Sequence, residues 1–343
     1  MSDLLEQIKL PRFVVPFTPR MSPHQMAVEA HSRAWAQEYG LIRNAKALKR
    51  FDMACFSGLA ARTYPSANFH DLCIVNDWTV WLFMQDDQFD EAEIGKQSQQ
   101  LQTYAAQVID LLENPRPCSV ENDGPLVASL AELWQRMCAG MDEGCQRRFI
   151  ENNRNYFKAC QWEAENRALG YIPTIDEYIV NRRETSALKS CVDLIYLSEK
   201  LTFPDEIRER DDLQGLAEMA NDALSWANDV ISFPKEYSRG DVHNLVTAIK
   251  HERGVSIQEA VDEAADYSNR TVREFIALEA TVPSFGKEMD SQVQRFISVL
   301  KSWIRGNLDW SYVTGRYNVA NVVAAGEEPA YLETITTGSN AAH

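Results

Sequence analysis

Apolar residues recur every three to four positions along nearly every long segment of this chain, which is the spacing of one face of an α-helix. No segment shows the alternation of apolar and polar residues, bounded by turn signals, that a β-sheet requires. The pattern therefore predicts an all-α fold. The expected helices cover residues 23–39, 44–62, 68–85, 92–113, 124–141, 144–168, 174–200, 212–236, 255–280 and 285–309.

Pro and Gly residues punctuate single loops and do not gather into a linker, so we expect the helices to form one domain. No fixed-period repeat is present, which disfavours a helical solenoid. The two ends of the chain lack an apolar stripe. We expect a flexible N-terminus over 1–11, a single helical domain over 12–320 and a disordered C-terminal tail over 321–343.

The composition excludes several classes of partner. A formal net charge of −16 argues against nucleic acid or an anionic membrane surface as the main partner. The start of the chain lacks the pattern of a signal peptide, and no apolar run approaches the roughly 20 residues that span a bilayer. The cysteines form no C-x-x-C pair and no zinc spacing, so we expect reduced thiols in a cytoplasmic protein.

An acidic cluster follows the apolar run V-W-L-F-M. The sequence D-D-Q-F-D-E occupies 86–91 and contains no basic residue. On a helix, Asp86 and Asp90 lie on one face a single turn apart, and Asp87 can turn partly towards the same space. Carboxylate oxygens one turn apart suit Mg²⁺, which keeps several waters and accepts one or two carboxylates. The alternative is a solvated turn at the end of a helix, where acids oppose the helix dipole.

A row of oxygen-bearing side chains forms a second candidate metal site. The sequence N-D-V-I-S-F-P-K-E occupies 228–236, and it places Asn228, Ser232 and Glu236 on one helical stripe. An amide, a hydroxyl and a carboxylate supply only oxygen donors, which Mg²⁺ prefers. Lys235 is adjacent and could reach an anion held by that metal. An ordinary polar helix face remains the alternative for any one of these residues.

Together the two motifs resemble the aspartate-rich and N-S-E motifs of class I terpene synthases, particularly bacterial ones. That family also carries an Arg-Tyr pair near its C-terminus, and this chain reads G-R-Y at 315–317. The resemblance extends from about Phe13 to Tyr317. It implies a single class I terpenoid synthase-type helical bundle around a central apolar active-site cavity, with the activity of a sesquiterpene synthase.

The resemblance also assigns ligands. It implies three Mg²⁺ ions, one held by the N-S-E motif and two by the aspartate-rich motif. The metal ligands would be Asp86, Asp90, Asn228, Ser232 and Glu236. The family also uses a longer D-D-x-x-x-E spacing, which Glu91 satisfies, so Asp90 and Glu91 both stay open as ligands. The residues that would bind the substrate's diphosphate are Arg182, Lys235, Arg316 and Tyr317, and Arg182 matches the family's diphosphate-sensing arginine.

Further expected site residues come from the same resemblance. Thr185 and Ser186 would take the linker and effector positions in the family's helix break. Phe83 would line the cavity beneath the metals, and Trp303 matches a position where relatives often carry a cavity aromatic. Ordinary core packing is the alternative for both rings, and Trp78, Trp81, Trp226 and Trp310 are expected to be packing residues. The expected catalytic residues are Arg182, Asp87, Phe83 and Ser186.

The implied activity is that of a carbon–oxygen lyase. It would ionise and cyclise a linear prenyl diphosphate, farnesyl diphosphate above all, to a cyclic sesquiterpene hydrocarbon or alcohol with release of diphosphate. Geranyl and geranylgeranyl diphosphates remain open as substrates. A prenyl chain-elongating synthase would carry a second aspartate-rich motif, and a non-catalytic acidic helical binding protein would explain the charge but not the ordered motifs. The expected partner is the small-molecule prenyl diphosphate, and the protein is expected to be a monomer or a homodimer.

Overall fold

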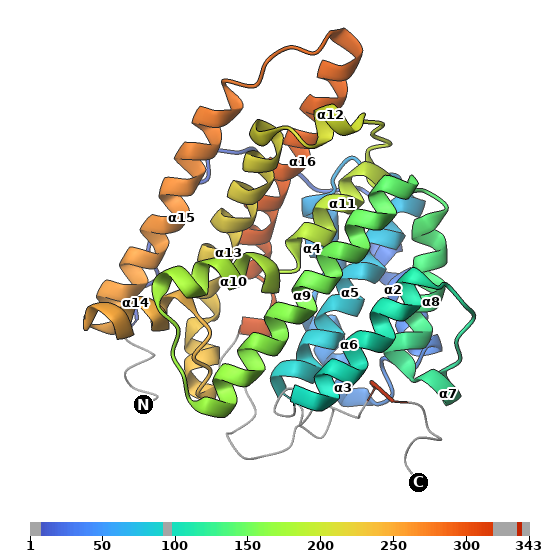
Figure 1. The fold of residues 1–343 in the computed structure, drawn as a ribbon, viewed down its shortest axis with the longest axis horizontal. Helices are drawn as coiled ribbons and strands as arrows, with labels where there is room; N and C mark the ends of the chain where they lie inside the picture. The colour runs from blue at the N-terminus through green and yellow to red at the C-terminus, as the bar shows by residue number, and fades with distance from the viewer. Residues whose placement is uncertain (1–7, 92–97, 318–334, 338–343) are drawn as a thin grey trace.

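The computed structural model describes residues 8–91, 98–317 and 335–337 of this chain (Figure 1). Within these residues every regular element is helical, which confirms the all-α prediction. The first half contains α2 (Gln25–Glu38), α3 (Ala45–Ala54), α4 (Phe56–Thr63), α5 (Phe69–Glu91), α6 (Ser98–Glu113), α7 (Val120–Asp123), α8 (Pro125–Cys138) and α9 (Glu143–Leu169). The second half contains α10 (Ile175–Thr185), α11 (Leu188–Ser198), α12 (Asp205–Arg208), α13 (Asp211–Arg239), α14 (Leu245–Arg253), α15 (Ile257–Glu279), α16 (Lys287–Ser311) and the 3-10 turn η2 (Gly315–Tyr317).

Helix boundaries differ from the sequence prediction at several places, and α7, α12 and α14 were not predicted. The predicted helix 44–62 is broken at Cys55. Helical periodicity predicted one helix over 174–200, but it is broken at Ala187, next to the break that the family resemblance implied at Thr185 and Ser186. Both residues adopt the left-handed conformation, with φ of 51° and 58°, which an L-residue other than Gly adopts only when its surroundings impose it. Apolar periodicity continues across Cys55 because α3 and α4 face the same core, whereas α10 and α11 on either side of Ala187 pack into two different apolar clusters. Helix α5 runs six residues beyond its predicted end at 85, so the acidic cluster is helical.

The core is built on stacked aromatic side chains. The Trp78 and Trp81 rings are stacked with centroids 5.0 Å apart, and Trp134 and Phe149 are stacked at 5.1 Å. Trp226 and Trp310 are also buried almost completely. These four tryptophans on α5, α13 and α16, together with Trp134 on α8, fix how the helices pack, because large rings bury the most apolar area.

Three helix pairs position the site. Helix α13 packs against both α15 and α16, and its neighbours can be followed in Figure 1. Helix α16 also packs against α4 at very short range. A Cβ atom at Gly306 of α16 would lie 2.7 Å from the Cβ of Arg62 and 2.9 Å from its carbonyl carbon. Only glycine therefore allows the two backbones to approach this closely.

The described part of the C-terminal tail is packed, which the sequence did not indicate. Ile335 is buried, its carbonyl accepts a hydrogen bond of 3.1 Å from the Leu126 amide, and the backbone of Thr337 lies against Gly124. The remaining residues of the predicted tail lie outside the described residues. Among the described helices, none combines the length and apolar character that crossing a bilayer requires.

Candidate active site

A cavity of about 340 Å³ lies between α4, α5, α9, α10, α11, α13 and α16. This volume is within the range of roughly 300–1,000 Å³ that small-molecule sites occupy. One part of its wall is apolar and consists of Leu59, Leu82, Phe83, Phe89, Leu188, Leu224 and Trp303. Another part is dense in charged and polar groups and consists of Asp86, Glu163, Arg167, Arg182, Asn228, Asp229, Lys235, Glu236, Arg239, Asp241, His243, Arg316 and Tyr317. The cavity thus combines an apolar compartment with a charged one.

The two adjacent aspartates of α5 face different partners. Asp86 lines the cavity, and 45% of its side chain is exposed. Burial and the neighbouring Asp87 carboxylate raise the pKa of Asp86 to about 6, although Arg316 opposes the shift. Asp87 instead accepts hydrogen bonds from Arg50 at 2.8 Å and from Arg316 at 3.0 Å. A rotation of about 100° per helical residue explains this separation.

The side chains of Asp90 and Glu91 lie outside the described residues, so the structure leaves their choice as ligands open. Asp86 alone of the predicted α5 ligands can be placed. Asp87 was expected to turn partly towards the space in front of Asp86, and in the structure its carboxylate is engaged by the two arginines instead.

The row on α13 lies where the sequence spacing predicted. Asn228 and Glu236 line the cavity, and Ser232 lies between them, one turn from each. The buried hydroxyl of Ser232 makes no hydrogen bond of ordinary geometry with the described residues, although it lies close enough to Glu236 to lower the pKa of that carboxyl. Burial and the nearby Asp229 and Asp241 carboxylates raise the pKa of Glu236 to about 7. A hydroxyl without an ordinary hydrogen bond beside a buried carboxylate fits a cation bound through oxygen atoms, so these residues suit a metal.

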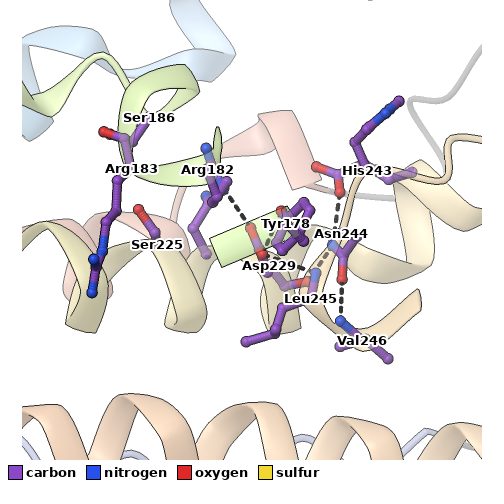
Figure 2. A network of polar contacts seen from close by, with 12 residues as sticks. Tyr178, Arg182, Arg183, Ser186, Ser225, Asp229, His243, Asn244, Leu245 and Val246 are labelled. Carbon is purple, nitrogen blue, oxygen red and sulfur yellow. Dashed lines mark hydrogen bonds and ion pairs between the residues drawn. The ribbon is translucent and has the colours of Figure 1, made fainter. Parts of the chain in front are cut away.

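A buried aspartate that sequence reasoning missed holds the site together. Asp229 accepts hydrogen bonds from Arg182 at 3.0 Å and from the Tyr178 hydroxyl at 2.7 Å. It also accepts one from the Leu245 amide at 3.0 Å, and Figure 2 shows the network. Although burial alone would lower it, the Asp229 carboxylate keeps the pKa of Arg182 above its usual value. The signal was present in the N-D pair, where Asp229 points away from the row that begins with Asn228.

Arg182 and Arg183 are separated by this network. Arg182 lines the cavity and donates a second hydrogen bond, of 3.0 Å, to Oδ1 of Asn228. Arg183 points in another direction (Figure 2). It binds both oxygens of Asp222, at 2.8 and 2.7 Å. The structure therefore brings Arg182, and not its neighbour, to the predicted metal row.

The turn η2 connects the two motif helices. Arg316 pairs with Asp87 and, at 3.5 Å, with Asp86 on α5, while the Tyr317 hydroxyl accepts a 2.7 Å hydrogen bond from Asn228 on α13. Burial lowers the pKa of Arg316, but the carboxylates of Asp87 and Asp86 raise it by more, so the pKa lies above its usual value. Lys235 lines the same part of the cavity. All four predicted diphosphate ligands thus border one compartment.

The predicted cavity aromatics both face the cavity. Phe83 stacks against Phe56 with centroids 5.0 Å apart, and the guanidinium carbon of Arg316 lies 4.5 Å from the centre of the Phe83 ring. This ring therefore already accepts a cation in the structure. Trp303 packs edge-on against Tyr64 at 5.5 Å. Both rings also pack on the main core, since Trp303 is buried within it and the Phe83 ring lies 5.5 Å from that of Trp310, so they form the boundary between core and cavity.

The helix break borders the cavity between α10 and α11. Thr185, Ser186 and Ala187 all line the cavity. The Ser186 hydroxyl donates to the Arg183 carbonyl and accepts from the Leu188 amide, both at 3.2 Å, which stabilises the end of one helix and the start of the next. The hydroxyl of Thr185 is buried and has no partner among the described residues. The predicted break and Arg182 are thus consecutive parts of one wall.

Sequence reasoning missed a further group of charged residues in the cavity wall, namely Glu163, Arg167, Arg239, Asp241 and His243. Glu163 and Arg167 are one turn apart on α9, with 3.8 Å between their charged atoms. Arg167 also lies 3.8 Å from Asp241 in the loop that follows α13. Their positions on a long helix and in a loop carry no motif, so only the spacing on α9 offered a signal.

Comparison with known proteins places these observations in a family. Residues 77–274 match a family model described as "Terpene synthase family 2, C-terminal metal binding". The chain is 36% identical over 306 residues to (+)-T-muurolol synthase ((2E,6E)-farnesyl diphosphate cyclizing) of Roseiflexus castenholzii, covering 89% of this chain and 93% of that protein. It is 31% identical to germacrene A synthase of Nostoc punctiforme, covering 92% of this chain and 97% of that protein. The crystal structure of α-eudesmol synthase superimposes with a TM-score of 0.81 at 26% identity, covering 89% of this chain and 100% of that chain.

Proposed function

Because the chain belongs to the terpene synthase family, whose members are lyases, we propose that it ionises farnesyl diphosphate with the help of Mg²⁺ and cyclises the resulting cation. The products would be diphosphate and a cyclic sesquiterpene hydrocarbon or alcohol. Farnesyl diphosphate is carried over from the T-muurolol synthase of Roseiflexus castenholzii, whose name states that substrate. We further propose that residues 12–320 form the catalytic domain.

One observation carries the proposal. Asn228 of the N-S-E row is hydrogen-bonded to both Arg182 and Tyr317, and Arg316 joins that group to the acidic cluster on α5. The groups that would bind metal and those that would bind diphosphate therefore form one connected set at one end of a cavity whose other wall is apolar. This arrangement suits a substrate with an anionic head and an apolar tail.

The metal would be held by Asp86 and Asp90 on α5 and by Asn228, Ser232 and Glu236 on α13. When bound, three Mg²⁺ ions would supply Lewis-acid stabilisation of the negative charge that develops on the leaving diphosphate. The acidic residues would hold the metal ions, and the bound ions would convert a negatively charged pocket into a binding site for an anion. Asp87 would keep Arg316 in position beside them.

The chain's own cations would bind the substrate's head. Arg182, Lys235 and Arg316 would donate charge-assisted hydrogen bonds to the diphosphate, with the Tyr317 hydroxyl as a further donor. The allylic carbon–oxygen bond then breaks, and its electron pair leaves with the diphosphate oxygen. Arg182 lies in the last turn of α10, just before the helix break at Thr185 and Ser186. A shift of its guanidinium towards diphosphate would therefore also move the part of the cavity wall that the break forms.

The apolar wall would protect and guide the carbocation. Leu82, Leu188 and Leu224 line the cavity with apolar side chains, which would limit premature capture of the cation by water. The Phe83 and Trp303 rings would each stabilise a passing cation by roughly 0.5–2 kcal/mol. The position of Arg316 above Phe83 supports this role for that ring.

The test is incubation of the purified protein with geranyl, farnesyl and geranylgeranyl diphosphates, each with and without Mg²⁺, followed by gas chromatography–mass spectrometry. We expect one dominant cyclic sesquiterpene from farnesyl diphosphate, lost without Mg²⁺ and in the Asp86→Asn and Asn228→Ala variants. The exposed Asp110→Asn variant on α6 serves as the matched control and should retain the product. Turnover of another chain length alone would refute the assigned substrate, and no turnover of any of them would refute the proposed function.

A further inference from the structure

A buried histidine in the cavity wall has no role in the function described so far. His243 lies in the loop between α13 and α14, and 2% of its side chain is exposed. Its Nδ1 lies 3.2 Å from Oδ1 of Asp241, and its backbone amide donates a hydrogen bond of 3.0 Å to the same oxygen. Because an ionised carboxylate only accepts hydrogen bonds, Nδ1 carries a proton and the orientation of the ring is fixed.

The second ring nitrogen of His243 is unpartnered. Its Nε2 is buried and makes no hydrogen bond with any residue in the described part of the chain, although the residue lines the cavity. The ring packs edge-on against Trp162 of α9, with centroids 5.6 Å apart. A buried polar atom is rarely left without a partner. An unpartnered nitrogen on a ring held firmly at the cavity wall therefore points to an atom of the bound ligand.

The surroundings of His243 indicate what that ligand atom would be. The other oxygen of Asp241 faces Arg167 at 3.8 Å, and Arg167 faces Glu163 at the same distance. From α13, Lys235, Glu236 and Arg239 border the same part of the cavity. The next residue in the loop, Asn244, donates a hydrogen bond of 2.8 Å to Glu236, which ties the loop to the N-S-E row. His243 thus belongs to the charged compartment and not to the apolar one.

We propose that His243 is a further diphosphate-binding residue, which donates a hydrogen bond from Nε2 to an oxygen of the diphosphate. This inference rests on the proposed function. Asp241 accepts the hydrogen bond from Nδ1 and the diphosphate would accept the one from Nε2, so the ring would bridge two anionic groups. When the allylic carbon–oxygen bond breaks, its electron pair stays on the diphosphate, and the hydrogen bond stabilises the added charge while the proton remains on Nε2.

Binding of inorganic diphosphate in the presence of Mg²⁺, measured by isothermal titration calorimetry, tests the proposal. The side-chain amide of His243→Asn can replace Nδ1 and keep the bond to Asp241, but it leaves nothing at the position of Nε2. We expect its dissociation constant to rise about tenfold, since a hydrogen bond to a charged group is lost. His243→Gln can reach the position of Nε2 and should recover part of the affinity. The exposed His251→Asn on α14 is the matched control.

Thermal unfolding of each variant separates binding from folding. Should His243→Asn fail to fold, His243→Phe, which keeps the packing on Trp162, takes its place in the titration. Diphosphate affinity in the Asn or Phe variant equal to that of the unaltered protein would overturn the role of His243 alone. Absence of diphosphate binding by an unaltered protein that is folded would instead overturn the proposed function on which it rests.

Discussion

The side-chain amide of Asn228 donates a hydrogen bond of 2.7 Å to the hydroxyl of Tyr317. The oxygen of the same amide accepts a hydrogen bond from Arg182. One residue of the candidate metal row therefore holds a side chain of α10 and a side chain of the C-terminal turn. Binding of a metal through that oxygen would require Arg182 to give up this bond, which would free its guanidinium for an anion.

Tyr317→Phe removes the hydroxyl that accepts the Asn228 hydrogen bond. We expect unfolding free energy to fall by about 1 kcal/mol and kcat on farnesyl diphosphate to fall about tenfold, because a donor to the diphosphate is also lost. Steady-state kinetics and urea unfolding measure the two effects. Tyr312→Phe is the control, since 53% of Tyr312 is exposed and it lies on the same segment. An unchanged kcat in Tyr317→Phe would contradict the role of this hydroxyl.

Asp229→Asn removes the carboxylate at the centre of the network in Figure 2. The buried Arg182 loses its ion-pair partner, so we expect unfolding free energy to fall by about 3–5 kcal/mol. Denaturation in urea checks this value. Asp266→Asn is the matched control, because Asp266 pairs with Arg273 at 3.9 Å on the surface and should change stability by less than about 0.5 kcal/mol. Equal effects of the two substitutions would show that the network does not hold Arg182.

Ser232→Ala separates stability from metal binding. The Ser232 hydroxyl is buried and makes no hydrogen bond of ordinary geometry with the described residues, so its removal should leave the stability of the metal-free protein unchanged or raise it by up to about 1 kcal/mol. The Mg²⁺ concentration for half-maximal activity should nevertheless increase, because an oxygen ligand is lost.

Ser129→Ala on α8 is the control for Ser232. Its buried hydroxyl donates a hydrogen bond of 3.1 Å to the Leu126 carbonyl, so this change should lower stability and leave the Mg²⁺ requirement unaltered. If Ser232→Ala instead destabilised the metal-free protein with no effect on the Mg²⁺ requirement, its hydroxyl would be a structural group.

Ala187→Gly relieves backbone strain at the helix break. Ala187 has a φ of 58°, which Gly adopts without a steric penalty. The greater freedom of Gly in the unfolded chain offsets part of this relief. The expected net gain is therefore about 0.5–1 kcal/mol of unfolding free energy. Ala106→Gly, at an exposed position inside α6, should act in the opposite direction by a similar amount. Destabilisation by both changes in thermal unfolding would refute strain at Ala187.

Asp193 predicts a pH dependence of stability. Burial raises the pKa of Asp193 to about 6, while Arg148 and Asn152 oppose the shift. The native state then holds a proton that the unfolded chain releases near pH 4, so this group lowers stability as pH rises from about 4 to about 6. Relative to the unaltered protein, Asp193→Asn should gain up to about 3 kcal/mol over that interval. Urea unfolding at several pH values measures the difference, and a difference that is constant with pH would contradict the expectation.

The helices and the motif row were predictable because helical geometry alone relates position in the sequence to position on a face. Asn228, Ser232 and Glu236 lie as their spacing predicts. The same geometry should have separated Asp87 from Asp86, since neighbouring residues turn away from each other on a helix. The left-handed Cys55 and Ala187 could not be predicted, because tertiary contacts impose a conformation that neither residue prefers.

The sequence did not predict which residues in loops, or on helix faces without a motif, would belong to the site. His243 and Asp241 enter the cavity only because Gly240 ends α13 and turns the chain back. Asp229 could be read as a helix-surface residue until α10 and the start of α14 were seen to surround it. Contacts between segments that are distant along the chain decide such positions, and no local pattern records them.

The close approach of Gly306 to Arg62 limits how this enzyme can change during evolution. Gly306 lies one turn after Trp303 and next to Asn307, both of which line the cavity. Any larger residue at 306 would push α16 away from α4 and move those side chains together. The distance between α16 and α4 therefore cannot change by small substitutions at position 306. A new product specificity would have to arise from exchanges of cavity side chains on a backbone that stays in place.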